Sequence, residues 1–509
     1  MILSELISSD RAECAGRIDI DISSITNDSR EVEEGGLYFA IPGAKVDGAK
    51  FIPGAINDGV AAIVTEWDSA KLKSEFGLTD DELGKVTIVK VENARYMMGV
   101  MSSRFYGEPS KRLKVIGITG TKGKTTTAYM IHDMLERAGH KTGLVGTIEI
   151  NDGKNIIPAK NTTPESIKLH KVFKDMIENG LDSVVMEVSS QGLKLNRVAG
   201  VDFDYGIFTN LSPDHIGPDE HDSYEEYRDC KKLLFSIVKK GFFNIDDPES
   251  AYMMDGSTCE MITFGEKEDA DYRASDIKIR KEMGTLGIEY TLSGKMNADI
   301  MVDLPGDFSV HNSLAAIVVA DEMGVSKDKI CEILKKVKVR GRVEMIPISD
   351  KFTLMIDYAH NDMSLKSLIQ AIRQYEPKRI VTLFGCGGNR SKERRYGMGE
   401  VSGKYADFTV ITSDNPRNED PQAIIDDIKV GIGRTDGKYV EIIDRKEAIR
   451  YAIMNAVEGD IVILAGKGHE DYQEICGIKH HMDERDLIRE ILEEEDVTKI
   501  CGYNNRYFA

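Results

Sequence analysis

The sequence has few cysteines: seven among 509 residues, with no CxxC pair. A disulfide framework needs cysteines at regular, paired spacing, and a structural zinc site needs clustered cysteine or histidine ligands. The scattered cysteines therefore favour neither kind of structure.

The sequence also lacks an apolar run long enough to span a bilayer. Its first residues, MILSELISSDRAE, carry acidic groups where a signal peptide would be basic. We therefore expect a cytoplasmic protein with no segment inserted in a membrane.

Basic residues are in deficit, with 66 Lys and Arg against 86 Asp and Glu and a formal net charge of −20. Binding to nucleic acid needs a basic face that neutralises phosphates, so we expect no nucleic-acid partner. Small anionic substrates stay possible because they need only a local cluster of donors. At 41% hydrophobic and 30% charged residues, the chain is an ordinary globular protein too long for one core.

The most informative stretch is 113–130. An apolar run typical of a buried strand leads into a glycine-rich turn and then into a helical pattern. This is the anatomy of a phosphate-binding loop, in which glycines let backbone N–H groups surround phosphate oxygens. The predicted nucleotide-binding residues of the loop are Gly120, Thr121, Lys122, Gly123, Lys124, Thr125 and Thr126.

Within this loop, Lys124 is expected to reach the terminal phosphates and Thr125 to bind Mg²⁺. Ile118 stands where the usual pattern has its first glycine, so the loop is a compressed variant. The ordinary alternative is a Gly-Lys-Thr turn at the end of a strand, with no ligand.

Strands and helices alternate along the chain, which is typical of α/β proteins with mainly parallel sheets. We expect three α/β domains: a small N-terminal domain at 1–108, a central phosphate-loop domain at 109–337, and a Rossmann-like C-terminal domain at 338–509. Open parallel sheets bind ligands at the carboxyl ends of their strands. The expected strands are 35–41, 61–64, 113–118, 184–188, 205–208, 353–356, 380–384, 408–411 and 461–464.

Two charged residues fall at positions expected to be buried. Glu187 lies in an apolar strand, and a metal ion near the phosphate loop is the natural partner for its carboxylate. Lys231 lies on the apolar stripe of a helix expected over 223–240, whereas Lys232 points away from it. The ordinary alternative is that the aliphatic stem of Lys231 packs on apolar residues while its ammonium reaches water. The stripe consists of Tyr224, Tyr227, Leu234 and Val238.

Polar turns also follow the expected strands of the two outer domains. Ser29, Arg30 and the turn 43–48 lie at strand ends near the N-terminus, where a solvated turn is the simpler explanation of these residues alone. GRVE at 341–344 lies in the joint before the C-terminal domain, and the tail after Asp496 is expected to be loose. The C-terminal turns are 357–360, 385–390, 414–417 and 466–470.

These motifs together resemble those of the Mur ligases, the ATP-dependent amino-acid ligases of peptidoglycan precursor synthesis. The resemblance covers about Thr26 to Glu490, and its motifs occur in the same order as in the family. They are GTKGKTT, NTTPE, MEVSS, NLSPDH, GRVE, DYAH, DNPR and GKGHEDYQ. Each motif alone is of middling specificity, but all eight in order make a chance match implausible. The sequence is most similar to members that add the third residue to UDP-N-acetylmuramoyl-L-alanyl-D-glutamate.

The resemblance implies a role for each candidate residue. Lys231 matches a lysine that takes up CO₂ to form a carbamate (N6-carboxylysine), which would turn a buried cation into an anion. The implied catalytic residues are Lys124, Glu187, His215 and Lys231, and the implied metal ligands are Thr125, Glu187, His215 and Lys231. Further nucleotide contacts are Asn312, Arg342 and Asp357. Contacts to the UDP-muramoyl dipeptide are Ser29, the turn Gly43–Asp47, Thr162, Thr163, Ser189 and Arg197. The pocket for the incoming amino acid is Arg390, Asp414, Asn415, Arg417, Gly466 and Glu470.

The resemblance also implies ATP and Mg²⁺ as cofactors and a UDP-muramoyl dipeptide and a diamino acid as substrates. We also expect a monomer. Arg417 in DNPR favours meso-diaminopimelate, because it can hold a carboxylate that L-lysine lacks. L-lysine stays open as the alternative, because DHIGPDEHDSYEEY is closer to lysine-adding streptococcal members. Lys122, Gln191 and Leu195 also depart from the usual family residues.

Two further alternatives remain at this stage. Folylpolyglutamate synthases share a GTKGK-type loop and a related fold, but they would not require the DSR turn at 28–30 or the DNPR motif. A nucleotide-binding paralogue without ligase activity is the other, and the intact set of four implied catalytic residues argues against it.

Overall fold

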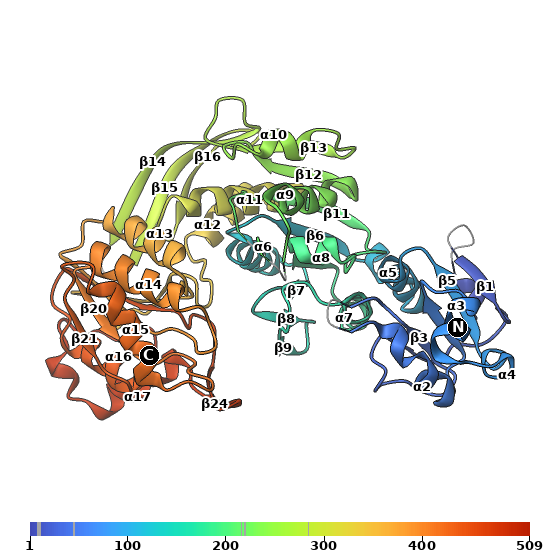
Figure 1. Ribbon diagram of the computed structural model, residues 1–509. Coiled ribbons are helices and arrows are strands. Elements are labelled where there is room, and N and C mark those ends of the chain that lie inside the picture. Colours follow the sequence, from blue (N-terminus) through green and yellow to red (C-terminus); the bar gives the residue numbers. More distant parts are fainter. Residues whose placement is uncertain (8–11, 44–45, 215, 218–219, 283–284, 509) are drawn as a thin grey trace. The chain divides into compact units, whose positions relative to one another are not determined.

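The computed structural model describes residues 1–7, 12–43, 46–214, 216–217, 220–282 and 285–508 (Figure 1). The chain divides into two compact units, Met1–Phe264 and Gly265–Ala509, and each is described by itself. Within the described ranges, no helix is both long and apolar enough to cross a membrane.

The first unit begins with a five-stranded sheet in the order β1-β5-β4-β3-β2, parallel except for β1. Its strands are β1 (Ala12–Ala15), β2 (Ile25–Thr26), β3 (Leu37–Phe39), β4 (Ala62–Thr65) and β5 (Thr87–Val91). Its helices include α1 (Leu3–Leu6), α2 (Ile52–Asn57), α3 (Ser69–Phe76), α4 (Asp80–Leu83) and α5 (Ala94–Phe105). Leu37 and Phe39 pack with α1 and α5 on one face, and Tyr38 packs with α2 and α3 on the other. This alternation follows from the two-residue period of a strand.

A larger, mostly parallel sheet follows in the same unit, in the order β13-β12-β11-β6-β10-β7-β8-β9. Its strands are β6 (Lys114–Thr119), β7 (Thr142–Val145), β8 (Glu149–Asn151), β9 (Ile156–Pro158), β10 (Ser183–Glu187), β11 (Phe203–Phe208), β12 (Val238–Asn244) and β13 (Glu260–Gly265). Its helices are α6 (Lys124–Ala138), α7 (Ser166–Glu178), α8 (Ser190–Lys194), α9 (Tyr224–Lys232) and α10 (Ser250–Met254). The central strand β6 lies between β10 and β11, so the loop after β6 is flanked by the ends of both neighbours.

The helix expected over 223–240 is shorter than predicted. Helix α9 ends at Lys232, a 3₁₀ turn covers Leu233–Ser236, and Val238 already belongs to strand β12. Phe242 and Phe243 make this segment a good buried strand between β11 and β13, and this pairing outweighs a helical continuation. The predicted helical conformation is therefore wrong for Val238, although this residue is buried in the same core cluster as Tyr227 and Leu234. The predicted burial is also confirmed for Tyr227 and Leu234, which are fully buried, and Tyr224 is half-buried.

The second unit starts with an antiparallel meander, which the sequence did not predict. It consists of β14 (Tyr272–Glu282), β15 (Thr285–Gly294) and β16 (Ala298–Val302). The buried helix α11 (Phe308–Glu322) contacts β14 and β15, and α12 (Lys327–Leu334) contacts β16.

A six-stranded sheet in the order β17-β18-β22-β19-β20-β21 completes this unit, parallel except for β17. The strands are β17 (Glu344–Met345), β18 (Thr353–Asp357), β19 (Arg379–Phe384), β20 (Phe408–Ile411), β21 (Tyr439–Glu441) and β22 (Asp460–Ala465). Helices α13 (Asp362–Arg373), α14 (Lys392–Tyr405) and α15 (Pro421–Ile432) pack on one face, and α16 (Arg445–Met454) and α17 (Glu484–Glu494) on the other. A separate hairpin contains β23 (Tyr472–Ile475) and β24 (Ile478–His481). The doubly wound architecture predicted for the C-terminal domain is confirmed.

The prediction of a loose C-terminal tail is wrong for the described residues. Ile500 is buried in the core beneath α16 and α17, and Arg506 pairs with Asp350 at 2.8 Å. The Tyr507 hydroxyl donates a hydrogen bond of 2.6 Å to Glu344. The tail therefore covers the start of the sheet at β17, an arrangement that its polar composition did not suggest.

Glu344, the last residue of GRVE, is the centre of a buried polar network. Its carboxylate pairs with Arg485 and accepts the Gly341 N–H at 2.7 Å. Arg485 also pairs with Asp483 at 2.9 Å and donates to the Gly468 carbonyl at 3.2 Å. Burial favours the neutral acid, but hydrogen bonding to Arg485 and its charge outweigh burial, so the pKa of Glu344 is below its usual value.

Replacing Tyr507 with phenylalanine is expected to lower the free energy of unfolding by about 1–3 kcal/mol, because a buried carboxylate loses a hydrogen-bond donor. The midpoint of urea unfolding measures this change. Tyr503→Phe is the matched control, because the Tyr503 hydroxyl has no hydrogen bond within the described ranges. Equal losses in the two variants would show that the contact with Glu344 contributes nothing.

Candidate active site

The loop between β6 and α6 has the backbone conformation that its glycines allow. Gly120 and Gly123 have φ of 151° and 86°, and α6 begins at Lys124. A Cβ on Gly120 would lie 2.0 Å from the Thr209 hydroxyl, so the close approach of the next strand's end requires glycine. The predicted order of strand, glycine loop and helix is confirmed.

Two lysines converge on one carbonyl of this loop. The ammonium groups of Lys124 and Lys231 donate to the Gly120 oxygen at 2.8 Å and 2.9 Å. Lys124 also reaches the Thr121 carbonyl at 3.1 Å. Two like charges on one acceptor repel each other, so the site favours an arrangement in which one lysine loses its positive charge.

Lys231 is the lysine whose charge is costly. It is 2% exposed, and its ammonium lies over the Tyr227 ring at 4.5 Å from the centroid. Burial, followed by the charge of Lys124, lowers the pKa of Lys231 well below its ordinary value. The buried position is therefore confirmed, and the alternative of a stem that carries its ammonium to water is wrong. Lys232, with 26% of its side chain exposed, points away as predicted.

Glu187 ends strand β10 beside the loop and is 1% exposed. Its Oε2 accepts hydrogen bonds from the Thr125 and Thr147 hydroxyls, both at 3.0 Å, and its Oε1 accepts the Thr147 N–H at 2.8 Å. Within the described ranges, no cation pairs with this carboxylate. A buried carboxylate beside a hydroxyl, held by neutral donors alone, is a donor set that suits Mg²⁺.

Sequence reasoning missed two residues that support the site: Thr147, which contacts Glu187, and Asn210, which contacts the phosphate loop. Thr147 follows the carboxyl end of β7, so the rule that located the other turns could have found it. Asn210 follows β11, and its side chain accepts the Lys122 N–H at 2.9 Å and donates to the Lys122 carbonyl at 3.0 Å. Its carbonyl accepts the Thr121 N–H at 2.9 Å. The backbone of the loop is therefore held by the neighbouring strand's end.

The residues predicted to contact the UDP-muramoyl dipeptide in the middle of the chain come together. Thr163 and Ser189 lie 3.2 Å apart through their hydroxyls, and Arg197 donates to the Thr163 carbonyl at 3.2 Å. Thr162 lies 3.0 Å from Thr147, which in turn contacts Glu187. These polar groups therefore adjoin the phosphate loop on one edge of the sheet.

The predicted ligand His215 lies outside the described residues, as do positions 44 and 45 of the turn Gly43–Asp47. A second histidine that the sequence analysis did not single out is fully buried: His221 contacts the Ser190 hydroxyl at 2.9 Å. Burial lowers the pKa of His221, so it is held neutral near neutral pH.

The N-terminal candidates lie in turns, as predicted from their position at strand ends. Asp28–Arg30 form a turn after β2, and Ser29 is half-buried there. A hydrogen bond from Arg30 lowers the pKa of Asp28 to about 2. Arg30 also lines a cleft of about 480 Å³. Asp47 begins the 3₁₀ turn Gly48–Phe51, and its carboxylate accepts the Ala49 N–H at 2.9 Å.

The remaining nucleotide candidates belong to the second unit and are described separately from the phosphate loop. The Arg342 guanidinium lies 4.7 Å from the Tyr358 ring centroid, and its buried Nε has no hydrogen-bond partner within the described ranges. Asp357 accepts the Val343 N–H at 2.8 Å, and burial raises its pKa although the charge of Arg342 opposes this. Asn312 is buried in α11, apart from this pair.

The four turns of the C-terminal sheet gather at one edge, because β18, β22, β19 and β20 are parallel neighbours. Asp414 and Asn415 are buried at this edge, and a Cβ on Gly466 would lie 3.1 Å from an Asp414 carboxylate oxygen. Asn415 donates to Glu470 at 2.9 Å. Asp414, Asn415, Gly466 and Glu470 therefore form one group, as their shared position at strand ends predicts.

A fully buried lysine that the sequence analysis missed organises this group. Lys467 donates to Asn415 at 3.0 Å, to Glu470 at 2.7 Å and to the Tyr472 carbonyl at 2.5 Å. In the sequence, the feature that could have singled out Lys467 is its position between the two glycines of GKGH. The Asn415 side chain already makes hydrogen bonds with Lys467 and Glu470, and these bonds fix its position in the site.

The two candidate arginines differ in exposure. Arg390 is exposed, and its side chain makes no hydrogen bond or ion pair with any residue that the structure describes. Arg417 donates to Glu474 at 3.1 Å and to the Gly388 carbonyl at 2.7 Å. A Cβ on Gly387 would lie 3.4 Å from Nη1 of Arg417 and 3.8 Å from Cγ of Arg390. Gly387 therefore leaves room beside both arginines.

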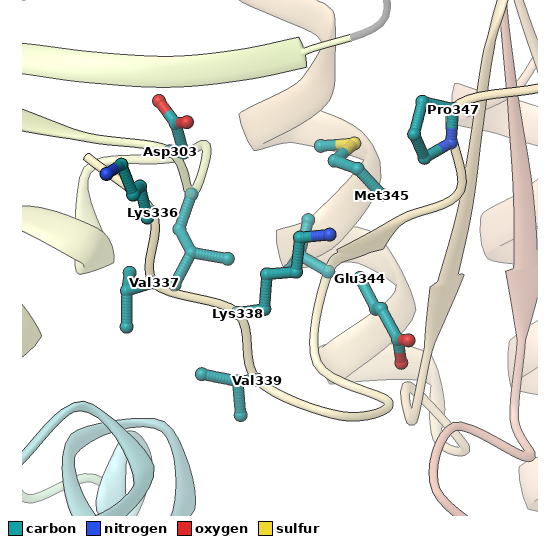
Figure 2. A pocket seen from close by; sticks show the side chains of 10 residues that line it. Asp303, Lys336, Val337, Lys338, Val339, Glu344, Met345 and Pro347 are labelled. Atoms are coloured by element: carbon teal, nitrogen blue, oxygen red, sulfur yellow. The ribbon is translucent and has the colours of Figure 1, made fainter. Parts of the chain in front are cut away.

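A separate cavity of about 130 Å³ lies along the linker that precedes β18 (Figure 2). It is lined by Asp303 and Leu304, which follow β16, and by residues between Lys336 and Pro347, a stretch that includes β17. This cavity is not lined by any residue to which the sequence analysis gave a catalytic or binding role. It is therefore distinct from the group of polar turns at the sheet edge.

The fold and the phosphate loop define an α/β protein built to bind a phosphorylated ligand at the carboxyl ends of parallel strands. Three family models match along the chain: "Mur ligase family, catalytic domain" at 21–106, "Mur ligase middle domain" at 118–320, and "Mur ligase, glutamate ligase domain" at 341–468. The chain belongs to the Mur ligase family.

Its relatives cover nearly the whole chain. The UDP-N-acetylmuramoyl-L-alanyl-D-glutamate--2,6-diaminopimelate ligase of Caldanaerobacter subterraneus subsp. tengcongensis is 43% identical, over 97% of this chain and 100% of that protein. The protein named as ligase 1 of the same kind in Clostridium acetobutylicum is 40% identical, over 94% and 96% of the two chains. A solved structure with the same ligase name has 28% identity and a TM-score of 0.70, and covers 97% of this chain and 99% of that one.

A folylpolyglutamate synthase structure from Mycobacterium tuberculosis is 18% identical, with a TM-score of 0.56 over 72% of this chain and 91% of that one. This similarity shows a shared fold alone.

Proposed function

We propose that this protein is an ATP-dependent ligase that joins meso-diaminopimelate to UDP-N-acetylmuramoyl-L-alanyl-D-glutamate in peptidoglycan precursor synthesis. The observation that carries the proposal is the buried Lys231, which shares the Gly120 carbonyl with the phosphate-loop lysine. The names of the relatives supply the substrates. Similarity over nearly the full chain also favours this function over a folylpolyglutamate synthase.

The first step activates the free carboxylate of the substrate's D-glutamate. A carboxylate oxygen attacks the γ-phosphorus of ATP, the bond to the β,γ-bridging oxygen breaks, and ADP leaves with that electron pair. The product is an acyl phosphate. This transfer needs positioning and charge neutralisation more than covalent help. Lys124, at the start of α6, is the residue proposed to contact the transferred phosphoryl group.

Thr125 and Glu187 fit a Mg²⁺ ion, because their oxygens lie 3.0 Å apart and the carboxylate has no cation partner within the described ranges. When bound, Mg²⁺ supplies neutralisation of the phosphate charges. In the protein, Thr147 orients the Glu187 carboxylate through two hydrogen bonds. His215 and carbamylated Lys231 are the proposed ligands of a second ion.

Carbamylation of Lys231 is chemically simple. The neutral amine attacks the carbon of CO₂, forms an N–C bond and releases one proton, which leaves an anion in place of a cation. A lysine whose pKa is lowered supplies more neutral amine at neutral pH. The change would also end the repulsion between the two ammonium groups at Gly120. Like Glu187, Lys231 would then carry an anionic group that can bind a metal ion.

In the second step, the amine of the incoming diamino acid attacks the acyl carbon. The tetrahedral intermediate collapses, the bond to the phosphate oxygen breaks, and inorganic phosphate leaves while the attacking nitrogen loses a proton to give the amide. The polar group of Asp414, Asn415, Gly466 and Glu470 is the proposed pocket for this amino acid. Arg342 and Asp357 are proposed to contact the nucleotide, and closure of the domains would assemble the reacting groups.

The decisive experiment gives purified protein ATP, Mg²⁺ and UDP-N-acetylmuramoyl-L-alanyl-D-glutamate together with one candidate amino acid at a time. We expect release of ADP and phosphate with meso-diaminopimelate and formation of the UDP-muramoyl tripeptide, seen by mass spectrometry. Preferred use of L-lysine would overturn the amino-acid assignment but keep the ligase. No dipeptide-dependent ATP hydrolysis with any amino acid would instead favour a non-catalytic nucleotide-binding paralogue.

The first domain is proposed to bind the UDP end of the substrate without taking part in the chemistry. Replacing Ser29 with tryptophan is therefore expected to raise KM for the UDP-muramoyl dipeptide about tenfold or more with a small change in kcat, because only binding shared by ground and transition states is lost. Steady-state kinetics measure both constants.

Ser74→Trp, on the exposed surface of α3, is the control for a bulky substitution in the same domain. It should leave both constants unchanged. A collapse of kcat at constant KM in Ser29→Trp would contradict the assignment.

A further inference from the structure

We infer that Arg445 is a positioning residue for the proposed amino-acid pocket: together with Glu484, it fixes the turns that carry Asp414 and Gly466 relative to each other. Only 1% of the Arg445 side chain is exposed, so it acts without touching the substrate. This inference rests on the proposed function and deepens it. Neither Arg445 nor Glu484 lies in any of the eight motifs of the sequence.

The Arg445 guanidinium joins two strand ends to a helix of the C-terminal sheet. Its Nη1 donates to the Ser413 carbonyl and its Nη2 to the Ala465 carbonyl, both at 3.1 Å. Nε and Nη2 also donate to Oε1 of Glu484, the first residue of α17, at 3.0 Å and 2.8 Å. The Glu484 side chain is fully buried, so these bonds form in a low-dielectric interior, where hydrogen bonds are stronger than in water.

Both carbonyls come immediately before a residue of the proposed pocket, because Ser413 precedes Asp414 and Ala465 precedes Gly466. A peptide group is planar, so a carbonyl that is held in place also fixes the direction of the next residue's N–H. Strand β19 lies between β20 and β22, so the hydrogen bonds of the sheet do not join these two ends directly. Arg445 makes this connection.

The spacing of these turns leaves little tolerance. A Cβ on Gly385, which follows β19, would lie 2.8 Å from the Asp414 nitrogen, closer than real Cβ atoms come to other atoms. A Cβ on Gly466 would lie 3.1 Å from an Asp414 carboxylate oxygen. A small shift of either turn would therefore change the shape of the pocket.

Contacts with two strand ends distinguish Arg445 from the other buried arginines of this unit. Among the described residues, Arg395 donates to one backbone carbonyl, that of Gly387 at 3.4 Å. Arg485 likewise donates to one, that of Gly468 at 3.2 Å. Each of these arginines therefore supports a single turn, whereas Arg445 joins two.

Stability does not explain the buried pair. Arg445 is the first residue of α16, where the helix dipole disfavours a cation. The second oxygen of Glu484, Oε2, is buried and has no hydrogen-bond partner within the described ranges. Replacing a buried ion pair with apolar side chains of similar volume is often neutral or stabilising. The pair therefore serves the geometry of the pocket more than the stability of the domain.

The test replaces both members together, because a single substitution would leave the other charge buried without a partner. Arg445→Met/Glu484→Leu keeps apolar volume at both positions but cannot donate to either carbonyl. We expect the midpoint of urea unfolding to stay close to that of wild type. We expect kcat/KM for the diamino acid to fall about tenfold or more, and KM for the UDP-muramoyl dipeptide to change less than about twofold.

The matched control is Lys446→Gln/Glu490→Gln, which removes a surface ion pair of 2.7 Å between the same two helices. It should change none of these quantities. Unchanged kcat/KM for the diamino acid in the folded Met/Leu variant would overturn the inference, because the pair would then act in packing alone. Equal losses for the diamino acid and the dipeptide would also overturn it, because they would indicate a general disturbance.

A second pair of substitutions covers a loss of stability in the Met/Leu variant. In Arg445→Gln/Glu484→Gln, the two amides can bond to each other, but the shorter side chain at 445 cannot reach both carbonyls. Loss of the fold in this variant as well would show that the pair is needed for the core itself and would overturn the inference.

Wild-type protein is measured first with meso-diaminopimelate and with L-lysine. If it ligates neither, the proposed function and this inference are overturned together. If it prefers L-lysine, the choice of amino acid is overturned, and the same comparison with L-lysine decides the inference. In an active enzyme, the ratio of the two substrate responses therefore tests Arg445 alone.

Discussion

Replacing Lys231 with alanine is expected to abolish ligation while the protein still folds. The variant loses a buried group beside the phosphate loop, together with the anion that its carbamate would provide. Electrostatic stabilisation of two like-charged reactants, here the substrate carboxylate and the γ-phosphate, is among the largest contributions to catalysis in such a reaction. We therefore expect kcat to fall about a thousandfold or more. Initial rates of phosphate release measure it.

Short carboxylic acids such as formate or acetate are expected to restore part of this activity, because a small anion can enter the space that the lysine vacated. Lys232→Ala is the matched control, since its side chain points away from the loop, and it should keep wild-type activity. In ¹³C-bicarbonate, wild-type protein should show a carbamate carbon by NMR that Lys231→Ala lacks. Unmodified Lys231 in well-ordered density, with metal and nucleotide bound, would contradict the prediction.

Replacing Arg417 with alanine is expected to cost about 2–5 kcal/mol of meso-diaminopimelate recognition, or roughly 30-fold to several thousandfold in kcat/KM. The physical reason is that a carboxylate held by a guanidinium fork loses both its charge partner and its directional donors. Arg417→Lys should recover only part of this loss, because an ammonium keeps the charge but not the planar fork.

L-lysine provides the internal control for this prediction, because it has no far carboxylate. Its poor kcat/KM should change little in Arg417→Ala, so that the preference for meso-diaminopimelate over L-lysine falls. Arg434→Ala, at a surface pair with Glu400, controls for the loss of a cation in the same unit. A wild-type enzyme that already prefers L-lysine by a wide margin would refute the role of Arg417.

Much of the candidate site was predictable because it follows strands. Buried parallel strands are continuous apolar runs, so their ends are easy to find, and ligand-binding residues collect just beyond them. Glu187 and Lys231 were predicted as buried charges from local pattern alone, and the structure confirms their burial. The helix through Val238 was predicted wrongly, because pairing with β11 and β13 decided its conformation.

By itself, the sequence determined the phosphate loop, the α/β alternation and the polar turns, because each depends on residues within one short stretch. Only the tertiary structure decided that Thr147 supports Glu187, that Lys467 joins Asn415 to Glu470, and that Glu474 pairs with Arg417. The physical reason is that side-chain hydrogen bonds are satisfied by whichever strand ends lie next to each other in the sheet. That order, β10 beside β6 or β22 beside β19, follows from packing of the whole chain and is not written in any single motif.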